Sequence, residues 1–336
     1  MTQFWESRTS DMKQQVRVLG YRNLRRWPQL AMAAICLLAG FSVARAQFLE
    51  SPMRIAEGPP GQMLVSDSRQ DKVFAIDQKR LAPVWSFAVP GTPMAVAFAA
   101  NLVFIGNAST QNVEVYRLKG TQKGSGKTLE FLFNLGLTPI GVPGNIRTPS
   151  DIDLDKDAQL AFVLDSGERK VKVFDFAGNI VSAFPALSDP PLLSPTAIAV
   201  DTLRQEVLVS DYGDPNGSFF STANVPARIM IYTYSGMFLA KIDGGVDTAD
   251  YQFGRPQGLA TDNAGHIFMA ESLLGQIYVF DRSNGSVVKK LGGFGDGPGE
   301  LQLPLDLFID KHSQDMFVTN NMLRRIEIFR AAGGLQ

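Results

Sequence analysis

Six polar side chains occupy matched places along this chain and are the first candidates for chemistry. Carboxylate and amide oxygens can hold Ca²⁺, and they can also cap a turn by accepting hydrogen bonds from backbone N–H groups. The six, each at the end of an apolar run, are Asp67, Asn107, Asp165, Asp211, Glu271 and Asn320. Because the positions repeat, turn capping is their structural interpretation, and a place in a binding site is the functional one.

The spacing around these six residues reveals an internal repeat. Each lies 14 to 16 residues after a proline that opens a short apolar run. A V-x-V-aromatic type of strand starts six residues later in five units, and 18 residues after Asp211 in the fourth, which carries an insertion. The prolines are Pro52, Pro93, Pro149, Pro195, Pro256 and Pro304. A period of about 40–60 residues with several strands per period is typical of a propeller or a solenoid.

The third unit, residues 149–187, predicts four antiparallel strands. Apolar or alternating runs at 149–155, 160–164, 170–175 and 180–184 are separated by short turns. One such sheet cannot bury its own faces, whereas six packed around an axis can. We therefore expect an all-β, six-bladed β-propeller of four-stranded antiparallel blades over residues 47–336, with almost no helix.

The sixth unit lacks a fourth strand in the sequence. Nothing after the run at 326–329 fits one, while the segment FLES before Pro52 resembles ELQL before Pro304. We expect the N-terminal segment to supply this outer strand and to close the ring, since closure removes exposed sheet edges.

The first 46 residues have the order of an export signal. Arg22, Arg25 and Arg26 precede an uncharged apolar stretch at 30–43, and residues 44–46, Ala-Arg-Ala, offer a cleavage site. The alternative to a cleaved signal is an N-terminal membrane anchor, but the stretch is too short to span a bilayer comfortably. We expect cleavage near Ala46 and a mature chain in the periplasm or outside the cell.

Composition narrows the choice of partners. Cys36, the only cysteine, lies in the signal, so the mature chain has no disulfide, thiolate metal site or covalently attached c-type haem. Residues 47–336 hold 25 basic and 31 acidic residues, with no basic block. We therefore expect no nucleic-acid partner and no membrane insertion of the mature chain.

The repeat resembles that of the NHL-repeat propellers, of an exported bacterial type. The segments that carry the resemblance are PTAIAVD at 195–201, VSD at 209–211, PQGLATD at 256–262, QIYVFD at 276–281 and the linker GGFGDGPGEL at 292–301. The second unit departs most, with Phe98 in place of the usual acidic residue. The resemblance implies the propeller fold, and the family includes binding modules, bacterial envelope scaffolds and some enzymes.

One face of such a propeller carries the turns between second and third strands and the connections between units; we name it the insertion face. The long insertions fall there, at 136–148, 185–194, 212–227 and 244–255. Elaborated loops on one face of a rigid scaffold usually mark a binding face.

Two groups of residues on the insertion face are candidates for binding. Tyr212, Asp214, Phe219 and Phe220 belong to the longest insertion, and exposed aromatic side chains often anchor interfaces. The alternative for the two phenylalanines is that they fold back onto the ring. Around the channel mouth of the same face we place Arg54, Asp151 and Asp306.

Metal chemistry finds little support in the sequence. His266 and His312 fall in turns on the opposite face, whereas zinc-dependent peptide-hydroxyglycine lyases of this architecture use several histidines at the channel mouth. Glu57-Gly-Pro looks like the first piece of the calcium pattern of lactonase-like propellers, but the matching asparagines are missing. We expect no cofactor beyond weak Ca²⁺ binding.

The sequence therefore favours an exported, non-catalytic scaffold that engages a protein partner on its insertion face. Family resemblance extends this to a bacterial envelope complex, including complexes with multihaem cytochromes. The alternative is a lyase or lactone hydrolase with a carboxylate-bound metal in the central channel. Absence of the necessary histidines disfavours that enzyme.

Overall fold

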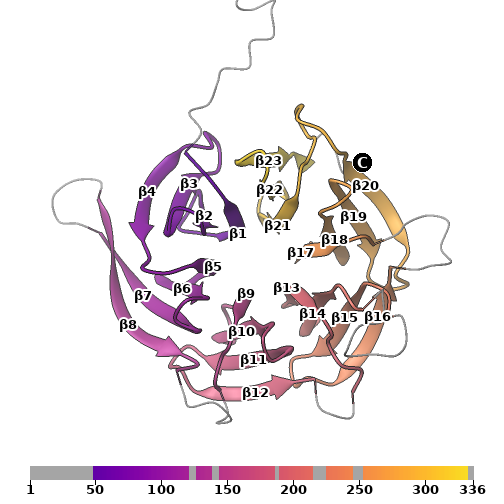
Figure 1. Ribbon diagram of the computed structural model, residues 1–336, viewed down its shortest axis with the longest axis horizontal. Coiled ribbons are helices and arrows are strands. Elements are labelled where there is room, and N and C mark those ends of the chain that lie inside the picture. Colours follow the sequence, from indigo (N-terminus) through magenta and orange to yellow (C-terminus); the bar gives the residue numbers. More distant parts are fainter. Residues whose placement is uncertain are drawn as a thin grey trace, which may run out of the picture. The chain divides into compact units, whose positions relative to one another are not determined.

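The computed structural model describes residues 48–120, 126–137, 144–185, 189–214, 225–244 and 253–331. Residues 47–336 form one compact unit, in which six antiparallel sheets surround a central axis (Figure 1). Every named element is a strand, and the six-bladed all-β prediction is confirmed. No helix in these ranges is long and apolar enough to cross a membrane.

Each blade runs in chain order from an inner strand at the axis to an outer strand at the rim. Blade 1 has β1 (Pro52–Glu57), β2 (Gln62–Asp67), β3 (Lys72–Asp77) and β4 (Pro83–Ala88). Blade 2 has β5 (Pro93–Ala99), β6 (Leu102–Asn107), β7 (Asn112–Gly120) and β8 (Lys127–Leu135). Blade 3 has β9 (Pro149–Asp155), β10 (Leu160–Asp165), β11 (Lys170–Asp175) and β12 (Ile180–Phe184).

The remaining three blades follow the same plan. Blade 4 has β13 (Pro195–Asp201), β14 (Glu206–Asp211), β15 (Arg228–Thr233) and β16 (Phe238–Asp243). Blade 5 has β17 (Pro256–Thr261), β18 (His266–Glu271), β19 (Gln276–Asp281) and β20 (Val287–Gly292). Blade 6 has β21 (Pro304–Ile309), β22 (Met316–Asn320) and β23 (Arg325–Phe329).

The core of the ring lies between the blades. Six clusters of buried apolar side chains each combine residues from two neighbouring blades, one cluster for every blade interface. Second strands such as β10 are buried on both faces, whereas outer strands such as β12 alternate between buried and exposed. This burial explains why a single blade is not stable alone and why six are, since each buried aliphatic side chain contributes about 1.5–3 kcal/mol.

Among the described residues, the predicted closing strand is not formed. Blade 6 has three strands, and residues 48–51 pair with neither β23 nor any other strand. Leu49 instead buries its side chain in the cluster between blades 6 and 1, beside Ile326 and Phe317. A side-chain contact thus replaces the expected strand, because the segment turns inward toward Asp67 before it can run along β23.

Candidate functional sites: the insertion face and the central channel

The six repeated polar residues are caps of the insertion face. Asp67 accepts hydrogen bonds from the backbone N–H groups of Glu50 (2.7 Å), Ser51 (3.1 Å), Arg69 (3.2 Å) and Gln70 (3.2 Å). It thereby joins its own turn to the segment that enters the blade. The same position binds both segments in blades 2 to 5, and in blade 6 Asn320 binds the entering segment. All six side chains have no exposed surface: Asp67, Asn107, Asp165, Asp211, Glu271 and Asn320.

Two of these capping carboxylates have a buried cation as an ion-pair partner. Lys172 lies 2.8 Å from Asp165, and Arg228 binds Asp211 with Nε and Nη2 at 3.1 and 3.0 Å. Burial raises the pKa of Glu271, which has no ion pair with a described residue. The capping geometry therefore accounts for all six residues, and their predicted role in partner binding stays a prediction.

The channel-mouth residues Arg54, Asp151 and Asp306 come together as a buried cluster. The Arg54 guanidinium lies 3.5 Å from Asp151 and 3.7 Å from Asp306. It also donates to the carbonyl oxygens of Ser150 (3.2 Å) and Leu305 (2.9 Å), and to that of Thr196. One side chain of blade 1 thus binds blades 3, 4 and 6 across the axis.

Small residues in one layer of the inner strands leave space for the Arg54 side chain to extend across the axis. The residue two places after each opening proline belongs to that layer: Arg54, Ala95, Asp151, Ala197, Gly258 and Asp306. Three charged side chains share this layer with three small residues, and a Cβ on Gly258 would lie 2.4 Å from Asp306 Cα. Burial and the nearby Asp151 charge raise the pKa of Asp306 well above its usual value, while Arg54 opposes that shift.

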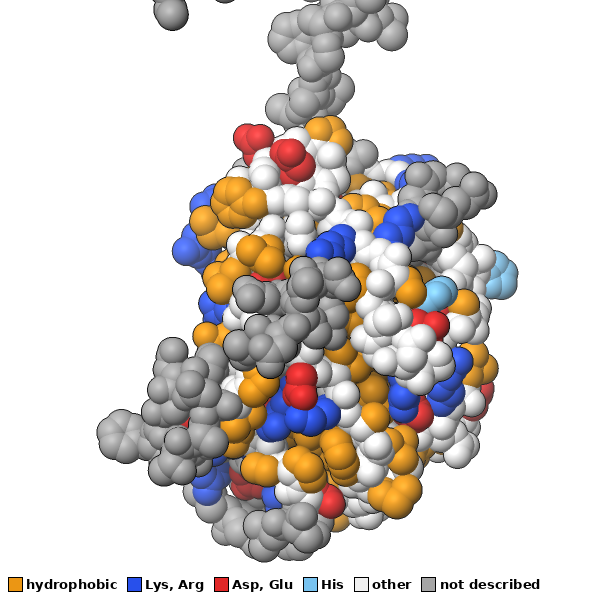
Figure 2. All heavy atoms as spheres, turned by 90° about the vertical axis from the view of Figure 1, so that its right-hand side faces the viewer, with side chains coloured by type: hydrophobic (Ala, Val, Ile, Leu, Met, Phe, Trp, Pro, Cys, Tyr) orange, Lys and Arg blue, Asp and Glu red, His pale blue; other side chains and the backbone are white. Residues whose placement is uncertain are grey.

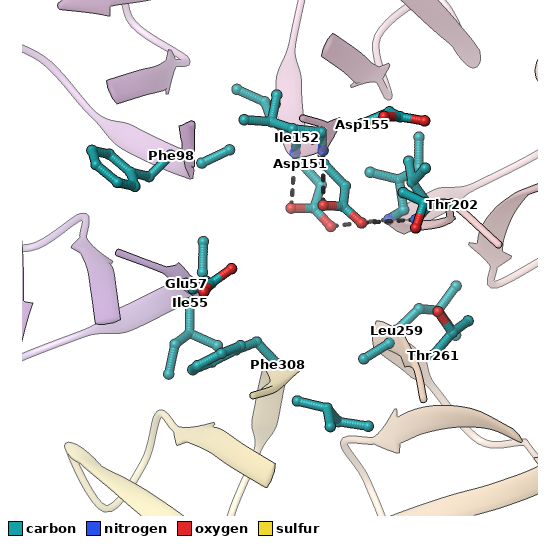
Figure 3. A pocket seen from close by; sticks show the side chains of 18 of the residues that line it. Ile55, Glu57, Phe98, Asp151, Ile152, Asp155, Thr202, Leu259, Thr261 and Phe308 are labelled. Atoms are coloured by element: carbon teal, nitrogen blue, oxygen red, sulfur yellow. Dashed lines mark hydrogen bonds between the residues drawn. The ribbon is translucent and has the colours of Figure 1, made fainter. Parts of the chain in front are cut away.

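Beyond the Arg54 cluster, the channel widens into a cavity of about 300 Å³. Its walls come from the second halves of all six inner strands and from the turns that follow them, so it opens on the face opposite the insertion face. Figure 3 shows labelled side chains from all six blades around this opening. Most wall residues are apolar, including Phe98, Leu259 and Phe308.

Asp153 is an additional carboxylate on the wall of this cavity. It lies on β9, and it accepts hydrogen bonds from the N–H groups of Leu154 (2.8 Å) and of Val200 in blade 4 (2.7 Å). Asp151 similarly accepts from Ile198 at 2.9 Å. Inner strands are sheet edges, so these carboxylates satisfy N–H groups that have no ladder partner. Burial is the main reason why the pKa of Asp153 rises to about 6.

The insertion face carries a groove across blades 3, 4 and 5. Described residues that line it include Arg169, Leu193, Tyr212, Arg255 and Leu273. Tyr212 is half-buried against the cluster between blades 4 and 5. The structure thus places one predicted site residue in a groove.

Of the other predicted site residues in this insertion, the structure describes Asp214 but not the two phenylalanines. Asp214 is buried and pairs with Val225 through backbone hydrogen bonds at the base of the insertion. Phe219 and Phe220 lie outside the described residues. The base of the insertion therefore begins as a short antiparallel pair. Tyr212, which precedes this pair, lines the groove.

Four exposed large apolar side chains extend this surface over blades 5 and 6. Leu273 is 57% exposed, Leu274 45%, Phe294 70% and Met322 63%. The first two and Met322 lie in turns after second strands, and Phe294 lies in the connection to blade 6, so all four belong to the insertion face. Leu273 also lines the groove, so the groove reaches the first of these four exposed side chains.

Candidate metal ligands are dispersed in the described part of the chain. It contains no group of three or more His, Cys, Asp or Glu side chains arranged to hold a metal ion. His266 binds Asp262 at 2.7 Å, and Glu57 pairs with Lys156. Both histidines lie toward one edge in Figure 2. Asp151 and Asp306 hold a guanidinium, so these residues do not fit a metal in the channel.

Comparisons with known proteins support the fold. A family model described as a 6-bladed beta-propeller matches residues 248–334. Protein brain tumor of Drosophila melanogaster is 24% identical over 151 residues, which cover 44% of this chain and 13% of that protein. The chain therefore spans only a small part of that relative.

Two solved structures are similar over most of the chain. Kuenenia stuttgartiensis Hydrazine Synthase has a TM-score of 0.57 at 13% identity, over 87% of this chain and 99% of that chain. A structural genomics protein of unknown function from Bacteroides thetaiotaomicron VPI-5482 has a TM-score of 0.62 at 14% identity, over 84% and 70%. At these identities the likeness concerns the fold alone, and the finer resemblance to NHL repeats remains a prediction.

Sequence reasoning missed three features of these sites. The cavity at the opposite face, the carboxylate of Asp153 and the exposed apolar surface around Leu273 were not expected. A signal for the cavity exists, because the residues four places after the prolines are small in four blades and include Asp153 in blade 3. The apolar turns Leu273-Leu274 and Met322-Leu323 also depart from the polar turns at this position in blades 1, 2 and 3.

Proposed function

We propose that this chain is an exported, non-catalytic binding module that holds a protein partner on its insertion face. The observation that carries the proposal is the groove of the insertion face together with the four exposed apolar side chains on that face, of which Leu273 lines the groove. Exposed apolar surface beside aromatic and arginine side chains is typical of protein interfaces. The export signal predicted from the sequence of residues 1–46 motivates the periplasmic or extracellular location.

The partner segment should present apolar side chains to Leu273 and Phe294, and acidic groups to the groove. Arg169 and Arg255 line the groove beside Tyr212, so an acidic segment would meet complementary charge there. An envelope or multihaem cytochrome complex remains a hypothesis that rests on the family resemblance.

Photo-crosslinking in the native cell tests the proposal. A p-benzoylphenylalanine residue replaces Leu273 on the insertion face or, as the matched control, Leu203 in a turn on the opposite face; these leucines are 57% and 68% exposed. We expect a discrete high-mass adduct from position 273 and none of the same size from position 203. Equal adducts from both positions, or none from 273, would contradict the proposal.

A further inference from the structure

The cavity in the channel is a second site that the proposed protein-binding function does not use. Arg54 and its partners lie at its inner end, while its other end opens on the face opposite the insertion face. A cavity of about 300 Å³ is at the small end of the range for ligand sites, and its wall combines apolar side chains with an unusually large number of charged ones.

Charge in the cavity is unbalanced toward the negative. Six acidic and two basic residues line it. Lys156 pairs with Glu57 at the rim, and Lys311 donates to the carbonyl oxygen of Thr261 at 2.8 Å. The Arg54 guanidinium forms ion pairs with both Asp151 and Asp306.

Asp153, Asp155 and Asp157 have no ion pair with a described residue, unlike Glu57, Asp151 and Asp306. Of these three, Asp155 accepts a hydrogen bond from the Tyr234 hydroxyl (2.8 Å) and Asp157 is exposed at the rim, so Asp153 is the carboxylate with only backbone partners on the cavity wall. Its two backbone hydrogen bonds leave further acceptor capacity on the carboxylate, since each oxygen has two lone pairs. It therefore offers a negative group on the cavity wall beside the apolar side chains of the inner strands.

We propose that this cavity binds a small organic cation, namely an ammonium group on a compact apolar body. The ammonium would donate to the Asp153 carboxylate, and the apolar body would pack among Phe98, Leu259 and Phe308. Aromatic faces near a cation add to such binding. The raised pKa of Asp153, about 6, still leaves the carboxylate ionised at pH 8.

Calorimetric titration of the mature protein at pH 8 with three isosteric probes tests the inference. The probes are 2-phenylethylamine, 2-phenylethanol and phenylacetate, which share an apolar body and differ in charge. We expect the amine to bind at least about tenfold more tightly than the alcohol, as a charge-assisted hydrogen bond implies, and phenylacetate not to bind. Equal binding of amine and alcohol, or no amine binding up to about 10 mM, overturns the inference.

A matched pair of variants locates the cation. Asp153→Asn should abolish the preference for the amine over the alcohol. Asp157→Asn removes the same charge from an exposed rim residue and should change amine affinity less than about threefold, because exposed charges interact weakly. Circular dichroism verifies that both variants fold. An undiminished preference for the amine in folded Asp153→Asn would overturn the assignment.

Discussion

The two faces of the propeller use carboxylates in opposite ways. On the insertion face, Asp67 and its equivalents are buried, and those of blades 1 to 5 each bind two separate segments of chain. On the opposite face, Asp77 and Asp281 cap short exposed turns through hydrogen bonds to nearby residues. Those local bonds lower the pKa of both side chains: the Arg80 N–H acts on Asp77, and Ser283 acts on Asp281.

This difference explains where each face can vary. Buried caps fix the entry and exit of every blade on the insertion face, so long loops can be inserted there while the strands below keep their register. The turns of the opposite face are short, several of them bond to a neighbouring blade, as Tyr234 does with Asp155, and they leave the channel open. Arg54 lies in the channel between the two faces and separates the channel cavity from the insertion face.

Replacement of Arg54 should have the largest effect on the comparison. Arg54→Ala leaves Asp151 and Asp306 buried without their cation, and loss of one partner of such a cluster costs about 3–5 kcal/mol. Urea unfolding should show this loss. The exposed Arg80→Ala is the control and should be near neutral; equal stability of both variants would show that the cluster does not hold the channel.

Titration of Asp153 should have the next largest effect. Its pKa is raised on folding to about 6, so its contribution to stability is complete below about pH 4 and disappears as the pH rises through 6. The free energy of unfolding of the wild type relative to Asp153→Asn should therefore fall by about 3 kcal/mol from pH 4 to pH 7.5. A difference that stays constant with pH would contradict the raised pKa.

Removal of one cap from each face should sharpen the comparison further. Asp67→Ala should cost about 2 kcal/mol, because four backbone N–H groups lose their acceptor. Asp281→Ala on the opposite face should cost clearly less, since water can replace an exposed acceptor. Thermal denaturation of both variants provides the measurement, and equal shifts would remove the distinction between the faces.

Much of the fold could be predicted because it depends on short periods in the sequence. The strands expected in residues 149–187 match β9 to β12 within one residue, since alternation and turn residues fix both their length and their ends. The closing strand was wrong because the likeness of FLES to ELQL ignored where Leu49 would be buried. Burial at a blade interface depends on the assembled ring.

The sites were harder to predict for a related reason. Repetition marked Asp67 and its equivalents as caps, and the structure gives them that geometry. It could not show that Arg54 reaches across the axis, because that contact joins residues 96 to 251 positions apart. The exposure of Leu273 beside Phe294 likewise depends on the arrangement of two blades.

Partner capture with one charge placed on either face is the most direct test of the central claim, that the insertion face is the protein-binding face. The comparison uses Leu273→Glu and Leu203→Glu, two exposed leucines on opposite faces, with proteins captured from the solubilised envelope fraction of the source cells. The account predicts that Leu203→Glu retains the proteins captured by the unmodified chain and that Leu273→Glu loses them. Retention by both variants, or loss only with Leu203→Glu, would contradict it.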